Sequence, residues 1–72
     1  MFPALGDAKI YLCREPIDMR KSYDTLSALA RSFLGEDPLS GSLFAFLNQP
    51  RNRVKILYYE SGGMVIWMKR WA

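Results

Sequence analysis

The sequence VKILYYESGGMVIWMKRW, residues 54–71, is the most informative stretch of this chain about its fold. Its two halves, residues 54–60 and 64–71, are rich in β-branched and aromatic side chains, which is typical of strands. The residues between them, SGG at 61–63, are turn formers. The stretch therefore predicts an antiparallel β-hairpin.

Two further strands are predicted upstream of this hairpin. LFAFL at residues 43–47 precedes the turn-rich stretch 48–52, so it extends the hairpin into an antiparallel meander. KIYLC at residues 9–13 alternates between two faces, as a short strand does. Pro16 follows it and cannot donate a hydrogen bond to a sheet, so this strand is expected to end before residue 16.

A helix is predicted between these two strands. Apolar residues at spacings of three and four form one stripe: Met19, Tyr23, Leu26, Leu29, Ala30, Phe33 and Leu34. Asp18 and Ser22 are both suitable N-caps, and the sequence does not choose between them. Gly35 stands where a helix ends with a positive φ, and Pro38 prevents the helix from resuming.

The predicted fold is a small α+β domain over residues 1–72, with the order β-α-β-β-β and one helix packed on an antiparallel meander. Both faces of the last two strands carry large apolar side chains, whereas one helix covers only one face. We therefore expect a segment beyond Ala72, a second copy or another molecule to cover the other face.

The composition disfavours an enzyme. The 72 residues include one cysteine, Cys13, and no histidine, so an internal disulfide, a zinc site and the commonest general base are all absent. Asp18 and Asp24 lie six positions apart, which does not place them on one helix face for a nuclease metal site. The other candidate carboxylates have ordinary positions in turns and strand ends: Asp7, Glu36, Asp37 and Glu60. We expect no catalytic residue, no metal and no cofactor.

No targeting segment is recognised. Residues 1–6, MFPALG, lack the basic start and the apolar run of a secretory signal. No run of about 18 apolar residues could span a membrane. With a single thiol, these features predict a cytoplasmic protein that does not contact a membrane.

The positive charge is concentrated toward the C-terminus. Residues 48–72 hold five basic side chains against Glu60 alone, a net charge of +4, whereas residues 1–47 have five basic and six acidic ones. The five are Arg51, Arg53, Lys55, Lys69 and Arg70. The hairpin brings the start of one strand beside the end of the next, so these cations are expected to share one end of the sheet and to bind nucleic acid.

Other residues accompany this predicted patch. Arg20 and Lys21 form a second basic pair at the helix start, where cations oppose the helix dipole unless they pair with Asp18 or Asp24. Aromatic side chains suited to base stacking or to a partner interface are expected beside the basic residues: Tyr59, Trp67 and Trp71. The alternative is that the cations are solvated strand ends and the aromatic residues are core.

Several motifs, in order, resemble one known family. IYLC at 10–13 and PIDMRKSYDTL at 16–26 are similar to its opening pattern, V-x-L then P-T-D-M-R-K-[GS]-F-D-G-L. DPLSGSLFAF at 37–46 and NRVKILYYE at 52–60, followed by Gly62 and Gly63, resemble its later motifs, and MKR at 68–70 resembles its x-K-R. The family comprises accessory proteins from the second reading frame of IS66-class insertion sequences, often labelled TnpB.

The resemblance implies a non-catalytic role in bacterial DNA transposition beside a separate transposase. Members usually continue beyond the Lys-Arg pair, so we expect this chain to lack the C-terminal segment usual in the family. The partners expected are DNA, the transposase of the same element and a possible second copy. The alternative function is a protein-interaction subunit, for oligomerisation or transposase docking, without direct DNA contact.

Overall fold

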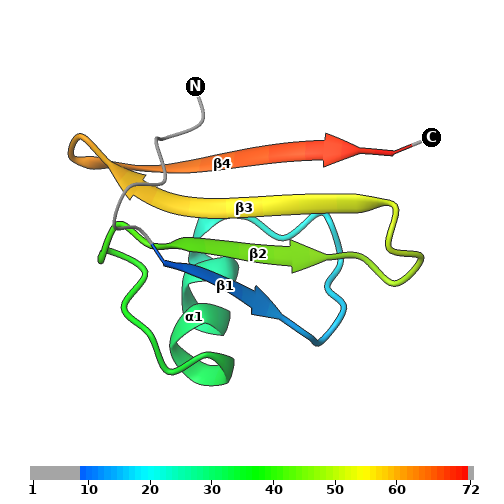
Figure 1. Ribbon diagram of the computed structural model, residues 1–72, viewed down its shortest axis with the longest axis horizontal. Coiled ribbons are helices and arrows are strands. Elements are labelled where there is room, and N and C mark those ends of the chain that lie inside the picture. The colour runs from blue at the N-terminus through cyan, green and yellow to red at the C-terminus, as the bar shows by residue number, and fades with distance from the viewer. Residues whose placement is uncertain (1–8, 72) are drawn as a thin grey trace.

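The computed structural model describes residues 9–71 and confirms the predicted α+β fold. The elements follow the predicted order: β1 (Ile10–Cys13), α1 (Tyr23–Phe33), β2 (Leu43–Leu47), β3 (Arg53–Glu60) and β4 (Gly63–Arg70). The four strands form one sheet. Figure 1 shows that this sheet is twisted and that α1 lies behind it. Within residues 9–71, no helix has the length and the apolar composition that a membrane span requires.

The strands lie in the sheet in the order β1-β2-β3-β4. β2, β3 and β4 form the predicted antiparallel meander, whereas β1 pairs with β2 in parallel. A parallel pair needs a crossover connection, and the segment that contains α1 supplies it. As a result, the ends of β1, β2 and β4 and the start of β3 lie at the same end of the sheet (Figure 1).

The core lies between α1 and one face of the sheet. Leu26 and Ala30 of the helix are fully buried against residues from three strands. These strand residues are Cys13, Phe44, Phe46 and Leu57, each at most 2% exposed. The ring of Tyr11 stacks on Phe44 with centroids 5.5 Å apart. Burial of these apolar side chains is the main stabilising contribution to a domain of this size.

The helix begins later than its apolar stripe predicted. α1 starts at Tyr23 with Ser22 as N-cap, so the prediction that Met19 belongs to the helical stripe is wrong. Residues 18–21 instead form a turn, in which the Lys21 N–H donates to the Asp18 carbonyl oxygen at 3.0 Å. The C-terminus agrees with the prediction, because Gly35 has a φ of 64° directly after the C-cap Leu34.

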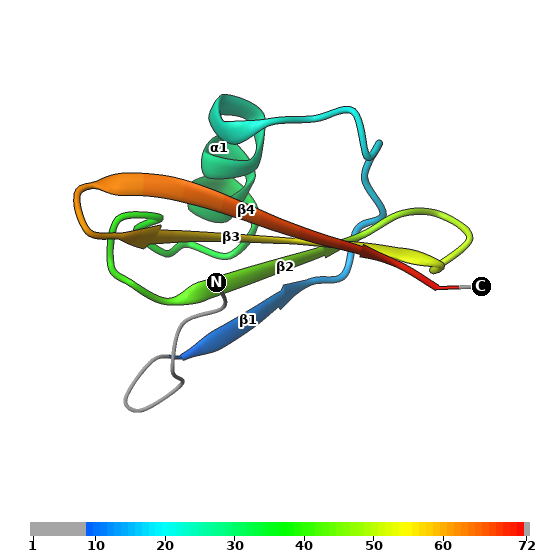
Figure 2. The ribbon, with the colours of Figure 1, turned by 90° about the horizontal axis from the view of Figure 1, so that it is seen from above.

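The far face of the sheet, opposite α1, also carries apolar side chains. Figure 2 shows α1 on one side of the sheet only. The far face buries Leu43, Val54 and Tyr58 but leaves Ile10 and Leu12 more than half exposed. The expectation that one helix covers only one face therefore holds for the described residues.

Candidate nucleic-acid interface

The basic residues gather at one end of the sheet, where β1, β2 and β4 end and β3 begins (Figure 1). We call this region the basic end. It holds eight of the ten lysines and arginines: Arg14, Arg20, Lys21, Arg51, Arg53, Lys55, Lys69 and Arg70. Lys9 precedes β1 at the other end of the sheet, and Arg31 lies in the last turn of α1.

The pairing of β3 with β4 sets the direction of the strand cations. Arg53 lies directly opposite Arg70, and Lys55 lies opposite Met68. Since side chains alternate along a strand, these three cations share the helix side of the sheet with Leu57. Lys69 lies opposite Val54 and occupies the far face. The basic end therefore presents positive charge on both faces.

A hydrogen bond joins the two basic groups that the sequence predicted separately. The Lys55 ammonium Nζ donates to the Lys21 carbonyl oxygen at 2.7 Å, which holds the segment before α1 against β3. An open depression of about 460 Å³ lies between this segment and the strand ends. Arg20 lines one side of it, and Arg53 and Met68 line the other. The structure thus brings both groups around one surface.

Asp18 is the partner of Arg20, which resolves one alternative left open by the sequence. The Arg20 Nη2 lies 2.6 Å from Asp18 Oδ2, and the Arg20 backbone N–H donates to Asp18 Oδ1 at 2.8 Å. These bonds hold the pKa of Asp18 well below its ordinary value and raise that of Arg20. The Arg20 side chain remains 90% exposed, so it stays accessible to a ligand.

The turn between β2 and β3 is organised by the side chain of Asn48. Its Oδ1 accepts hydrogen bonds from the backbone N–H groups of Asn52 and Arg53, each at 3.0 Å. Its Nδ2 donates to Asn52 Oδ1 at 2.7 Å. Within this turn Arg51 has a φ of 60°, a left-handed conformation that costs a residue with a side chain about 1–2 kcal/mol.

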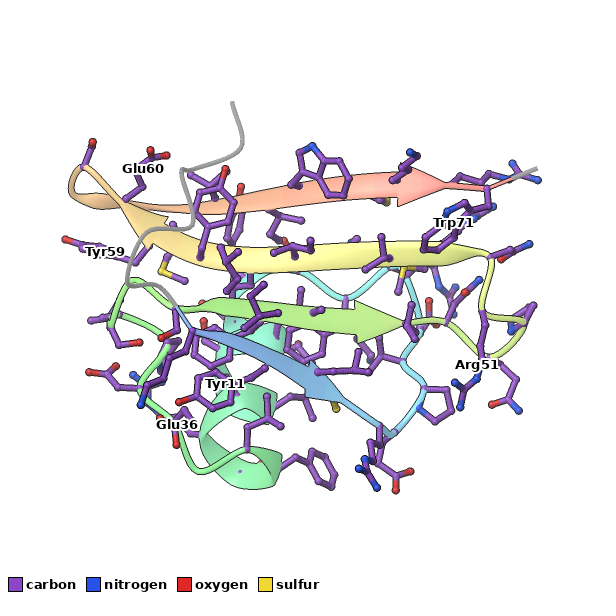
Figure 3. All side chains as sticks on the ribbon, in the orientation of Figure 1. Tyr11, Glu36, Arg51, Tyr59, Glu60 and Trp71 are labelled. Atoms are coloured by element: carbon purple, nitrogen blue, oxygen red, sulfur yellow. The ribbon has the colours of Figure 1, made fainter. Side chains whose placement is uncertain are left out.

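The three aromatic residues predicted beside the cations do not lie together. Tyr59 pairs with Met64 next to the β3–β4 turn, at the opposite end of the sheet from Trp71 (Figure 3). Trp67 pairs with Ile56 and lies on the far face, whereas Tyr59 lies on the helix side. The prediction that Tyr59 shares a face and an end with the two tryptophans is therefore wrong, because the cross-strand register separates them.

Trp71 does lie at the basic end. Its backbone N–H donates to the Asn52 carbonyl oxygen at 2.7 Å, which extends the β3–β4 pairing by one bond beyond β4. The side chain is 43% exposed and lies beside the start of β3 (Figure 3). An exposed aromatic ring is thus fixed close to the basic residues, as base stacking requires.

The opposite end of the sheet carries acidic groups. Glu36 lies beside Tyr11, and Glu60 ends β3 (Figure 3). Desolvation, followed by the hydrogen bond and the charge of Glu36, raises the pKa of the Tyr11 hydroxyl. Among the described residues, positive charge is therefore concentrated at the basic end, whereas Glu36 and Glu60 outnumber Lys9 at the opposite end.

Within residues 9–71, no three cysteine, aspartate or glutamate side chains gather as metal ligands would. Asp18 is bound by Arg20, and Asp7, a candidate carboxylate, lies outside the described residues.

Arg14 is a basic residue of this site that was not among the predicted ones. It directly follows β1, and the parallel pairing of β1 with β2 places it at the basic end.

Fold and site together define a small α+β domain with a concentrated basic end and no metal-ligand cluster in its described part. A family model described as IS66 Orf2 like protein matches residues 8–72. The chain belongs to this family, whose proteins are those of IS66-type insertion sequences. The resemblance predicted from its motifs is confirmed.

Two relatives come from Sinorhizobium fredii. Uncharacterized protein y4jC is 31% identical over 61 residues, covering 85% of this chain and 52% of the relative. Uncharacterized protein y4hO is 24% identical over 70 residues, covering 97% of this chain and 61% of the relative. The chain thus spans about half to three-fifths of these relatives. No solved structure matches it.

Proposed function

We propose that this chain is a non-catalytic accessory protein that assists transposition of its insertion sequence by binding DNA through the basic end. The main support for DNA binding is that eight of the ten basic residues lie at one end of the sheet. Membership of the IS66 Orf2-like family supports the link to transposition. The proposed partners are DNA and the transposase of the same element, and the chain would act on them in the cytoplasm.

The arrangement of the cations supports phosphate binding over simple solvation. Arg53 and Arg70 lie directly opposite each other, and like charges in that position destabilise a strand pair. Among the described residues, the carboxylate that forms an ion pair belongs to Asp18, and it pairs with Arg20. A DNA phosphate placed between the two guanidinium groups would relieve their repulsion and accept bidentate hydrogen bonds.

Fluorescence anisotropy with labelled DNA tests this proposal. The purified chain is titrated with an element-end duplex and with a scrambled duplex over a salt series. The variant Arg53→Gln/Arg70→Gln should bind more weakly. The negative slope of log K against log salt should become shallower by about 2. The control Lys9→Gln/Arg31→Gln removes the same charge away from the basic end and should bind like wild type. Equal loss in both variants, or no binding at low salt, would contradict the proposal.

A second function is favoured by the far face of the sheet. Ile10, Leu12 and Trp71 are 59%, 51% and 43% exposed, so this face offers apolar side chains that a protein partner could cover. This face would dock on the transposase or on a second copy, with Trp67 and Trp71 as anchors. Tyr59 is not part of this surface, because it lies on the other side of the sheet.

Trp71→Ala distinguishes the two functions. If the far face is a protein interface, this change should release the transposase in a pull-down, or dissociate a dimer in light scattering, and high salt should not. If DNA binding alone is correct, association with protein should be absent or should fall with salt. A monomer that fails to retain the transposase would exclude the docking function.

A further inference from the structure

A small pocket opens at the basic end between the last residues of β1 and the β2–β3 turn. Its volume is about 220 Å³. Leu12, Pro16 and Leu47 contribute apolar surface, and Arg14 and Arg51 supply positive charge. It is separate from the depression beside Arg20 and Arg53, and Asn48 is the one lining residue that the two have in common.

The walls of this pocket are fixed before any ligand binds. Asn48 is held by its hydrogen bonds to Asn52 and Arg53. Beyond β1, the Ile17 backbone N–H donates to the Leu47 carbonyl oxygen at 2.8 Å, which holds the chain after Pro16 beside the end of β2. A pocket built in this way loses little conformational freedom when it is filled.

The position of Arg51 is a second observation at this pocket. Its φ of 60° is one that glycine adopts without cost, yet the position carries a long cationic side chain. Ser61 in the β3–β4 turn has a similar φ of 51°, but Arg51 is the one of the two that lines a pocket, and strained backbone positions cluster at functional sites. Arg51 and Arg14 are both exposed and approach the pocket from different segments, so they could hold two successive phosphates.

We propose that this pocket receives one unpaired nucleobase of the bound DNA, while Arg14 and Arg51 bind its flanking phosphates. The inference rests on the proposed DNA-binding function and specifies its substrate as DNA with an unpaired nucleotide. The apolar surface of Leu12, Pro16 and Leu47 suits the face of a base. The volume lies below the ~300–1,000 Å³ typical of sites for larger ligands, so it suits a single planar group.

The chemistry disfavours a free inorganic anion in this pocket. An anion is held by several hydrogen-bond donors, but three lining side chains are apolar and the Asn48 amide already donates to Asn52. A nucleotide uses both parts of the surface, since its base is apolar on its faces and its phosphate is charged. Duplex DNA would offer phosphates to the arginines but no accessible base face.

The test compares three DNA molecules with the same duplex: blunt, with a short single-stranded overhang, and with that overhang made abasic. We expect the overhang to bind about 10-fold more tightly than the blunt duplex, and the abasic overhang to lose most of this gain. A 2-aminopurine in the overhang should change its fluorescence on binding. Arg14→Gln should reduce the preference for the overhang to less than 3-fold, because one of the flanking phosphates then loses its arginine.

Three outcomes separate this inference from the proposed function. Equal affinity of the wild-type chain for blunt and overhang DNA would overturn the pocket assignment and leave DNA binding intact. If the abasic overhang bound as tightly as the intact overhang, the pocket assignment would also be overturned, because only phosphates would then be recognised. No binding to any of the three molecules would overturn the proposed function itself. Arg31→Gln serves as the charge control and should keep the wild-type preference.

Discussion

Arg53 and Arg70 lie directly opposite each other on β3 and β4, on the face of the sheet that packs against α1. Two cations in this position repel each other, and no acidic side chain among the described residues forms an ion pair with either. The free protein is therefore less stable than it would be without two like charges at this cross-strand position. A bound anion would remove this disadvantage.

Replacing one of the two arginines should separate stability from binding. Arg70→Gln should raise the free energy of unfolding by about 0.2–1 kcal/mol, because it ends the cross-strand repulsion. The same change should weaken DNA binding and lower the salt slope by about 1. Urea denaturation and anisotropy measure the two effects. Lys69→Gln is the matched control: it lies opposite Val54, so it should give no gain in stability.

Arg51→Gly should also stabilise the fold. Glycine relieves the left-handed strain at φ 60° but adds chain entropy to the unfolded state, so the net gain should be up to about 1 kcal/mol. DNA affinity should fall, because a phosphate contact is lost. Arg51→Ala removes the same charge and keeps the strain, so thermal unfolding should show no gain. Equal stability of the two variants would contradict the strain argument.

Asn48→Ala should loosen the β2–β3 turn. It leaves the N–H groups of Asn52 and Arg53 without their acceptor, and each partly buried donor left unpaired costs about 1–3 kcal/mol. Amide hydrogen exchange in residues 50–53 should therefore accelerate, and DNA binding should weaken. Asn52→Ala removes only the bond to Asn48 Nδ2, so it should be the milder change. A reversed order would show that Asn48 does not organise the turn.

The ion pair of Asp18 and Arg20 predicts a specific acid titration. Arg20 lowers the pKa of Asp18, so the pair adds to stability at pH values above the ordinary carboxyl value near 3.8. This contribution is lost as the pH falls toward the lower pKa of the folded state. Carboxyl NMR should place the Asp18 midpoint below 3.8 in the wild type, and Arg20→Gln should move it upward. An unchanged midpoint in the variant would exclude the pairing.

Local patterns predicted most of the elements. The alternation in residues 54–71 and the glycines of its turn predicted β3 and β4, whose bounds agree within one residue. Gly35 predicted the end of α1. The start of the helix was not predictable from its apolar stripe, because the Asp18 side chain binds the Arg20 backbone and holds residues 18–21 in a turn.

The candidate site was less predictable, because it depends on how strands pair. Alternation assigns each side chain to one of two faces, but only the cross-strand register shows that Trp67 lies opposite Ile56 and Tyr59 opposite Met64. Arg14 was missed for a similar reason. Its place at the basic end follows from the parallel pairing of β1 with β2, a long-range contact that no local pattern encodes.

The separation of charge along the sheet has a kinetic consequence. With cations around Arg53 at one end and carboxylates such as Glu60 at the other, the molecule has an electric dipole along its strands. In the field of a polyanion this dipole would turn the molecule before contact, so a larger share of collisions would begin with the basic end. The association rate should therefore fall as salt is added, because the ions screen the field that orients the molecule during its approach.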